Sequence, residues 1–415
     1  PSASSNVVIP DTSSINNCVL DTSRTANSFR IDANGTFDGD GNTITVDSEG
    51  DATTGASEGY AIRIDGIISG SDTDFAITTP AATNVDLVPS SGTIRNLTIN
   101  HASAVVNIRS LATTISGNLT ITAGTLDTQN SGSNLDLTVA GDTTGAGTLA
   151  LNNSTYTGGG TGDSLSMTGT VTIGTSGVIT NVDQLGESGG TITCTGSPTL
   201  GCQRWRQPTA NWTPATSTLK IESNNRLFQT NGYGTPYNLE IDNSGNTNEL
   251  SDFVVVSNNL TITAGTLDTS SSNHALTVTG NTSIGPGSGS ADQATLTCNA
   301  STVSLGSGHT SSHALIVNQG GTFVGGSGAH TIGSIDVKNN SNAKCTLTSG
   351  NTTVDSEKTG DDRNIVIASS STFAHGSGTI ITTFAGTTHM DVDKTLNNLT
   401  INHASAVHKL SDSLD

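Results

Sequence analysis

A long phrase occurs three times in this chain of 415 residues. Residues 96–128 read NLTINHASAVVNIRSLATTISGNLTITAGTLDT, and residues 238–269 begin with NLEID and end with the same NLTITAGTLDT. A third copy begins at Asn398 with NLTINHASAV. The copies start at positions 96, 238 and 398, so the repeating units are long and unequal. Such a chain folds as an array whose units pack on their neighbours, either as a solenoid or as a string of like domains.

The copies divide the sequence into four parts. These are an N-terminal solenoid section (1–95), a first long unit (96–237) that includes a distinct insert (202–237), a second long unit (238–397), and the start of a third unit (398–415). The third copy stops where the next NLTITAGTLDT is expected. We therefore expect the natural protein to continue past Asp415.

A shorter period runs through the second half of the chain. Short segments with alternating apolar residues recur at sequence steps of 19, 20, 30, 15 and 19; they are marked by Leu296, Leu315, Ile335, Ile365, Ile380 and Leu399. Alternation buries one face of a strand, and the Gly, Asn and Ser clusters between the segments indicate turns. The pattern predicts an all-β chain with rungs of about 20 residues.

Composition separates the architectures that use such strands. Charged residues make up 12% of the chain, half the usual ~25%, which excludes a helical bundle. Phe, Trp and Tyr make up only 3%, whereas a β-sandwich places large residues between its sheets. A β-solenoid, or parallel β-helix, needs only small stacked apolar residues, so it is the predicted fold. Tandem β-sandwich domains remain the alternative.

Charge and hydropathy exclude two classes of partner. The formal net charge is −20 and the basic residues are scattered, whereas nucleic-acid binding requires clustered Lys and Arg. No run of 18 apolar residues occurs, so we expect no membrane span in this segment.

The five cysteines are an odd number, so at least one stays free or pairs outside the segment. Cys194 and Cys202 flank the turn-like sequence TGSPTLG. This spacing predicts a hairpin that a disulfide closes in an oxidising compartment, with two free thiols as the alternative. A zinc site is disfavoured because no His lies at ligand spacing nearby.

One loop has part of a calcium-binding pattern. Asp38, Asp40, Asn42 and Glu49 stand at positions 1, 3, 5 and 12 of an EF-hand-like loop, but position 6 is Thr43 instead of Gly. The favoured interpretation is a Gly/Asp turn with no cofactor. A bound Ca²⁺ is the alternative.

The insert at 202–237 differs from the rest of the chain because aromatic and basic residues gather there. Its candidate ligand-binding residues are Arg204, Trp205, Arg206, Trp212, Tyr233 and Tyr237. Aromatic faces stack on sugar rings, and Arg and Trp are common anchors of binding surfaces. The competing interpretation is a loop or small subdomain with the Trp residues as its core.

Other polar residues recur with the repeat and are expected to have structural roles. Asp127 and Asp268 occupy equivalent LDT turns, and His101 and His403 recur in NHASAV, whereas a catalytic His is not expected to come in copies. No pair of Glu residues recurs in the long repeat, and no hydrolase or nucleotide-binding motif is present. We therefore expect turn positions for the Asp residues, solvent-facing strand or turn positions for the His residues, and no catalytic residue.

Several phrases resemble known repeat proteins. The opening PSASSNVVIPDTSSINNCVLDTSRTANSFRIDANGTFDGDGNTITVDSEG resembles the start of secreted repetitive β-solenoid proteins of bacteria. GNLTITAGTLDT and GSGTIITTFAGTTHMDV are similar to repeats of very large surface and phage proteins, among them adhesins, autotransporter passengers and tail fibres. The resemblance implies a structural rod that is extracellular, on the cell surface or on a virion.

The expectation is thus a non-enzymatic β-solenoid rod within a larger appendage, either a surface filament or adhesin or a phage fibre. Its terminal rungs offer unpaired backbone groups, so we expect self-association, with surface glycans as further partners. Two alternatives stay open. One is a carbohydrate-binding or polysaccharide-cleaving spike that uses residues 202–237, and the other is a calcium-rigidified adhesin module.

Overall fold

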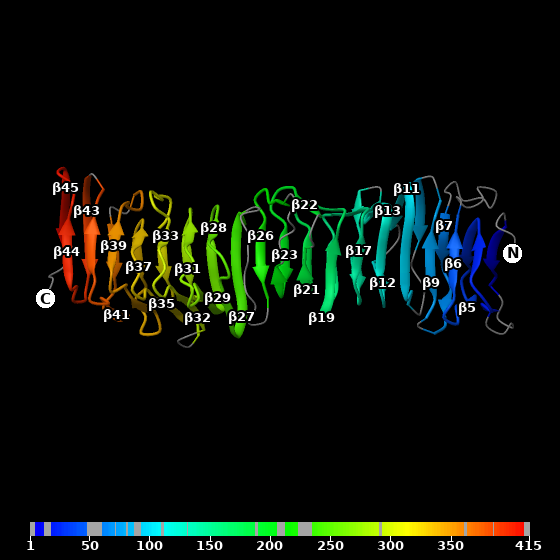
Figure 1. Ribbon diagram of the computed structural model, residues 1–415, viewed down its shortest axis with the longest axis horizontal. Coiled ribbons are helices and arrows are strands. Elements are labelled where there is room, and N and C mark those ends of the chain that lie inside the picture. Colours follow the sequence, from blue (N-terminus) through cyan, green and yellow to red (C-terminus); the bar gives the residue numbers. More distant parts are fainter. Residues whose placement is uncertain are drawn as a thin grey trace. The chain divides into compact units, whose positions relative to one another are not determined.

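The computed structural model describes residues 5–11, 18–47, 60–70, 72–79, 82–86, 93–108, 112–130, 132–186, 190–205, 212–222, 235–289, 293–360, 363–384 and 386–410, and no helix occurs among them. The chain divides into two compact units, Pro1–Ser217 and Thr218–Asp415. Within each unit, strands stack in parallel from turn to turn as a β-solenoid (Figure 1). The predicted solenoid is confirmed. Tandem sandwiches are wrong because their sheets are antiparallel, whereas the one antiparallel pair among the described residues joins β14 (Gln129–Asn130) and β15 (Ser133–Asn134).

Unit 1 consists of short strands separated by Gly, Asn and Ser turns. Besides β14 and β15 they are β1 (Asn6–Ile9), β2 (Cys18–Val19), β3 (Arg24–Ala26), β4 (Ser28–Ile31), β5 (Thr36–Asp38), β6 (Thr43–Val46), β7 (Tyr60–Ile64), β8 (Ile67–Ile68), β9 (Asp74–Ile77), β10 (Ala82–Asp86), β11 (Asn96–Ile108), β12 (Thr113–Ile115), β13 (Leu119–Asp127), β16 (Leu137–Val139), β17 (Thr143–Gly145), β18 (Thr148–Asn152), β19 (Thr155–Met167), β20 (Thr170–Ile173), β21 (Val178–Leu185), β22 (Thr191–Cys194), β23 (Thr199–Cys202), β24 (Arg204–Trp205) and β25 (Trp212–Thr213).

Unit 2 is built in the same way. Its strands are β26 (Thr218–Ile221), β27 (Asn238–Glu249), β28 (Val254–Val256), β29 (Leu260–Asp268), β30 (Leu276–Val278), β31 (Thr282–Ile284), β32 (Ala294–Thr297), β33 (Val303–Leu305), β34 (Leu315–Val317), β35 (Gly321–Val324), β36 (His330–Ile332), β37 (Ile335–Val337), β38 (Lys344–Thr346), β39 (Asn351–Val354), β40 (Arg363–Ile367), β41 (Thr372–Ala374), β42 (Thr379–Thr382), β43 (Gly386–Val392), β44 (Asn398–Ile401) and β45 (Ala406–Leu410).

The core of unit 1 consists of inward side chains that stack one above another, turn after turn. Parallel register places one such column at Phe75, Leu97, Leu119, Thr143, Leu165, Leu185 and Trp205. All of them are buried. Thr143 is the polar member, and its hydroxyl shares a hydrogen bond of 2.7 Å with the hydroxyl of Tyr156. The step from each member to the next, as from Leu97 to Leu119 and from Leu185 to Trp205, confirms the predicted rung length in this unit.

Unit 2 has more variable turns. On one face, the register runs through Val254, Leu276, Val303, His330, Thr352, Ile380 and Leu399. The longest step in this series leads from Thr352 to Ile380, and the shortest leads from Ile380 to Leu399. The segments at Leu315 and Ile335 pair with one another, as their step of 20 suggests. Leu296, however, pairs with Phe323 and not with Leu315. The steps of 19 from Leu296 and 15 from Ile365 therefore join strands of different faces.

The second and third copies of the long phrase lie on different faces of unit 2. NLEI of the second copy is in β27, which pairs with β29, and β29 is followed on that face by β31. NLTI of the third copy is in β44, which pairs with β42 on the face that begins with β28. Each face requires only an alternation of apolar and polar residues. The phrase therefore fits more than one face of the same coil.

Candidate functional site

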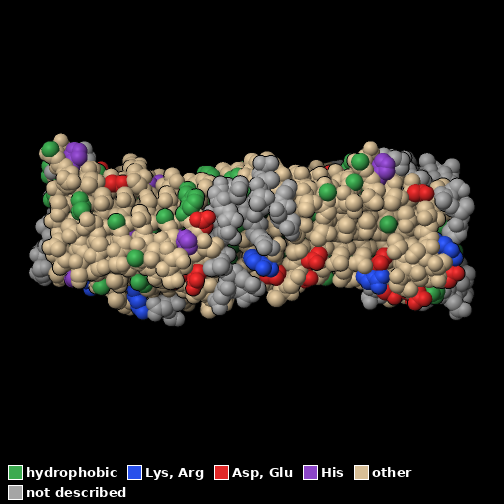
Figure 2. Space-filling view, in the orientation of Figure 1, with side chains coloured by type: hydrophobic (Ala, Val, Ile, Leu, Met, Phe, Trp, Pro, Cys, Tyr) green, Lys and Arg blue, Asp and Glu red, His purple; other side chains and the backbone are tan. Residues whose placement is uncertain are grey.

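The described surface is mostly uncharged. Figure 2 shows a face on which Ser, Thr, Asn, Gly and backbone atoms dominate, with few charged side chains. Toward the N-terminal strands, basic and acidic groups lie beside one another. Arg95 and Asp74 form such a pair, with two hydrogen bonds of 2.8 Å from Nε and Nη2 to the carboxylate. This ion pair raises the pKa of Arg95.

The two Trp residues of the aromatic insert lie in the core. Trp205 is 2% exposed and Trp212 is 7% exposed, and their ring centroids are 4.7 Å apart. Trp205 follows Leu185 in its column, and Trp212 pairs with Ile192. Both rings thus occupy core positions that the preceding strands fill with Leu185 and Ile192. Their faces are not available to stack on a sugar, and the interpretation of the Trp residues as core is confirmed.

The other candidate residues of the insert do not complete a binding platform in the described part of the chain. The Arg204 guanidinium lies 3.5 Å from the carboxylate of Asp183, whose side chain is nine-tenths buried. Tyr237 is half-buried in unit 2, and its carbonyl oxygen accepts a hydrogen bond from the Asn258 amide. Arg206 and Tyr233 lie outside the described residues.

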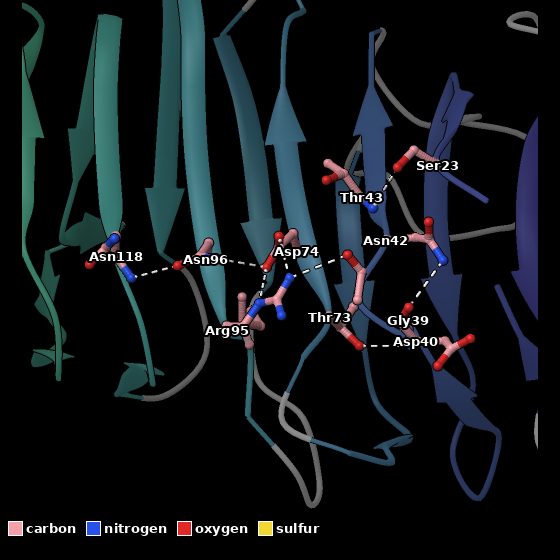
Figure 3. Close-up of polar contacts among 12 residues, drawn as sticks. Ser23, Gly39, Asp40, Asn42, Thr43, Thr73, Asp74, Arg95, Asn96 and Asn118 are labelled. Atoms are coloured by element: carbon pink, nitrogen blue, oxygen red, sulfur yellow. Dashed lines mark hydrogen bonds and ion pairs between the residues drawn. The ribbon is translucent and has the colours of Figure 1, made fainter. Parts of the chain in front are cut away.

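The candidate calcium loop is a hydrogen-bonded turn between β5 and β6. Asp38 Oδ1 accepts a hydrogen bond of 3.0 Å from the Asp40 amide, and the Asn42 amide donates to the carbonyl oxygen of Gly39. The Asn42 side chain donates to the carbonyl oxygen of Leu20, and it also donates to that of Asp40 (Figure 3). Glu49 lies outside the described residues. No group of three or more His, Cys, Asp or Glu side chains suited to a metal ion occurs in the described part of the chain.

The predicted hairpin between Cys194 and Cys202 is wrong. Cys194 is on β22, which pairs in parallel with β20 and β25, and Cys202 is on β23, which pairs in parallel with β21. The TGSPTLG turn therefore leads to the next face of the coil and does not bring the chain back on itself. Both cysteines are buried, and neither forms a disulfide. Burial raises the pKa of Cys194.

The repeated His residues form corners of the coil, as predicted. Nδ1 of His101 accepts a hydrogen bond of 3.2 Å from the Ser103 amide, and Nδ1 of His403 accepts one of the same length from the Ser405 amide. His375 makes this contact with Ser377 at 2.9 Å. The imidazole thus closes a local turn, in the way that Asn and Asp side chains do.

The repeated Asp residues also have matching contacts. Asp127 Oδ1 accepts a hydrogen bond of 2.6 Å from the Asn152 side chain, and Asp268 Oδ1 accepts one of 2.5 Å from Asn299. Both Asn residues have a φ of 48°, in the left-handed region that Asn tolerates. Each Asp also accepts a hydrogen bond from the amide two residues later. The role in a backbone turn that was predicted for LDT is therefore confirmed. The bonds to Asn152 and Asn299 also join each of these backbone turns to the next turn of the solenoid.

A ladder of polar side chains runs along another corner of unit 1. Asn96 donates to Asp74 Oδ1 at 3.0 Å, and its own Oδ1 accepts from the Asn118 amide at 2.7 Å (Figure 3). Asn118 Oδ1 then accepts from the Asp142 amide at 2.9 Å. Unit 2 repeats this arrangement from Asn259 to the amide of Asn281.

Sequence reasoning missed one group of carboxylates. Asp142, Asp163 and Asp183 come from successive turns, and their even spacing, which equals the turn length, is the signal that reveals them. Burial raises the pKa of Asp163, and the charges of Asp142 and Asp183 add to the effect. However, Asp142 accepts hydrogen bonds from the amide and hydroxyl of Ser164, and Asp183 accepts one from the Gly162 amide. The carboxylates of Asp142 and Asp183 thus bind backbone amides of a neighbouring strand.

A His and two Ser residues also lie within hydrogen-bond distance in unit 2. His309 Nε2 is 3.0 Å from Ser311 Oγ and 3.1 Å from Ser312 Oγ, distances at which a base activates a nucleophile. All three belong to one short loop and are near neighbours in sequence. The contact therefore holds a single loop together, as the imidazoles of His101 and His403 do at their corners.

Comparisons with protein families, curated proteins and solved structures found no match. Within the described residues, no helix has the length and apolar character needed to cross a membrane.

Proposed function

We propose that this protein is a non-enzymatic structural β-solenoid, a segment of a larger extracellular or virion appendage such as a surface filament, an adhesin or a phage fibre. One observation carries the proposal: the polar residues that recur with the repeat are engaged in holding turns. Asp127 and Asp268 bind Asn side chains of the following turn, and His101 and His403 close corners. Chemistry that depends on free carboxylates or imidazoles has little to use in these positions.

The mechanical role follows from the same contacts. Parallel backbone ladders and polar side-chain ladders both join each turn to the next. A load along the axis is then shared among many hydrogen bonds, each of which contributes about 1 kcal/mol. The surface of Ser, Thr and Asn keeps such a body hydrated with few charges (Figure 2).

Self-association is part of the proposal, because the edges of stacked parallel strands can pair with further strands. Surface glycans remain proposed partners, at surfaces other than the buried Trp pair.

Sedimentation velocity over a hundredfold concentration range tests the association, and incubation with surface polysaccharides tests the absence of catalysis. We expect elongated species that grow with concentration, and no change in polysaccharide chain length. A monomer at every concentration would remove the self-association. Turnover of a polysaccharide would overturn the non-enzymatic role.

A further inference from the structure

Three successive turns of unit 2 pass through the same corner of the coil with loops of very different length. The turns run from β33 to β34, from β36 to β37 and from β39 to β40, and each strand pairs in parallel with its counterpart in the next turn. The middle turn has only Gly333 and Ser334 at this corner, whereas residues 306–314 and 355–362 connect the strands of the outer two turns. Two long loops thus precede and follow a very short one.

A carboxylate of the third turn binds the loop of the first turn. Asp355 Oδ2 accepts a hydrogen bond of 2.5 Å from the Ser307 hydroxyl, and its Oδ1 accepts one of 3.2 Å from the Gly308 amide. Hydrogen bonds to an ionised carboxylate are stronger than those between neutral groups. Both side-chain oxygens of Asp355 are therefore engaged with a loop that lies two turns away along the coil.

Two further hydrogen bonds join the same loops. The Ser356 hydroxyl donates to the carbonyl oxygen of His309 at 3.1 Å, and the Thr359 amide donates to that of Thr310 at 2.8 Å. The middle turn lies directly against this contact, since a Cβ on Gly333 would be 2.6 Å from the Ser356 hydroxyl oxygen. The loops of the outer turns therefore meet at the corner of the middle turn and connect two turns whose strands do not pair.

A link that skips a turn changes how a solenoid opens. When each turn contacts only its neighbours, stability is a sum of turn and nearest-neighbour terms, and turns can open one at a time. We propose that residues 307–310 and 355–359 form a clasp that couples the first turn directly to the third, so that the three turns open as one unit. The inference rests on the proposed structural function and specifies a place where an axial load is shared over three turns.

A double-mutant cycle in the full chain tests the proposal. Val303→Ala weakens the first turn, because Val303 is 0% exposed in β33, and Asp355→Ala removes two bonds of the clasp without changing an apolar core residue. Amide hydrogen exchange of β39, in the third turn, is the readout. With the clasp intact, Val303→Ala should accelerate exchange in β39 as much as in β33, by at least about tenfold. With Asp355→Ala present, its effect on β39 should fall at least about threefold, and its effect on β33 should remain.

A matched control removes a link between adjacent turns. Asn339 Oδ1 accepts a hydrogen bond of 3.2 Å from the Ser370 amide, which joins the second turn to the third only. Asn339→Ala should leave the effect of Val303→Ala on β39 unchanged. If Asp355→Ala does not fold, Ser307→Ala removes one clasp bond from the other loop and should reduce the effect on β39 in the same direction. An effect on β39 that is the same with and without the clasp bonds, or that Asn339→Ala reduces equally, overturns the proposal.

The outcome is independent of the assembly in which the chain works. Exchange in dilute protein reports the opening of a single chain, so it does not depend on whether that chain belongs to an appendage. A failure of the proposed function would leave the coupling between the first and third turns intact. Absence of the coupling would leave a structural solenoid whose turns open one by one, so the two failures are distinguishable.

Discussion

The imidazole of His330 lies edge-on to the ring of Phe323 in the core of unit 2, with the ring centroids 6.0 Å apart. His330 is 2% exposed, and neither ring nitrogen has a hydrogen-bond partner among the described residues. It occupies the position in its column that Val303 fills one turn earlier. Burial lowers the pKa of His330 to about 4.

We predict that His330 makes the fold sensitive to acid. Its folded pKa of about 4 lies below the ordinary 6.5, so between these values the unfolded chain binds more protons than the folded one. The free energy of unfolding therefore has its full value above pH 6.5. It decreases as the pH falls toward 4, and the loss that His330 causes is about 3 kcal/mol at pH 4. Urea unfolding of the wild type and His330→Leu at pH 7.5 and pH 4 measures this. Between pH 7.5 and pH 4, the free energy of unfolding should decrease by about 3 kcal/mol less in the variant than in the wild type. An identical decrease in both proteins would refute the prediction.

The bond between Asp127 and Asn152 should stabilise the turn that it joins. Asn152→Ala removes the hydrogen bond and places Ala at a φ of 48°, so we expect a loss of about 2 kcal/mol in the free energy of unfolding. Asn152→Gly keeps the backbone relaxed and should cost about 1 kcal/mol. Denaturant titration measures both. The equivalent Asn299 variants serve as the matched pair, and a larger cost for Gly than for Ala would contradict the assignment.

The Trp pair should contribute to stability and not directly to recognition. Trp205→Ala leaves a cavity in a buried column, and we expect a cost of about 3–5 kcal/mol, whereas Trp205→Phe should cost less. Thermal unfolding together with glycan-array binding checks this. Binding that is lost at unchanged stability would show that the ring contacts a sugar.

The loop at Asp38 should be independent of calcium. Its carboxylate accepts the Asp40 amide hydrogen bond, and Asn provides the same acceptor, so Asp38→Asn should unfold at the wild-type temperature and Asp38→Ala should lose about 1 kcal/mol. The melting temperature should not change with EDTA. If EDTA lowered the melting temperature and added Ca²⁺ restored it, the calcium-rigidified alternative would be supported again.

The fold was predictable from sequence because each strand buries alternate residues, and the alternation at Leu315 and Ile335 is visible without a structure. The assignment of strands to faces was not predictable, since all faces carry the same alternation. Leu296 pairs with Phe323 and not with the nearer Leu315, because Leu315 lies on another face, where it pairs with Ile335.

The same limit explains the errors at the candidate sites. Gly, Ser and Pro between Cys194 and Cys202 indicate a turn, but turn residues do not say whether the chain reverses or moves on to the next face. Trp205 was open to both interpretations, core or binding anchor, because the strand before it has Leu185 at the same core position and gives no sign of a Trp there. Asp142, Asp163 and Asp183 were missed because the turn length in that region becomes known only from the register.

Electron microscopy of the native material tests the central claim, a structural solenoid within an appendage, most directly. The account predicts filaments, bundles or virion-attached fibres in which an antibody to this chain marks the shaft. Compact, dispersed particles of the single chain, with the antibody on no larger structure, would contradict it.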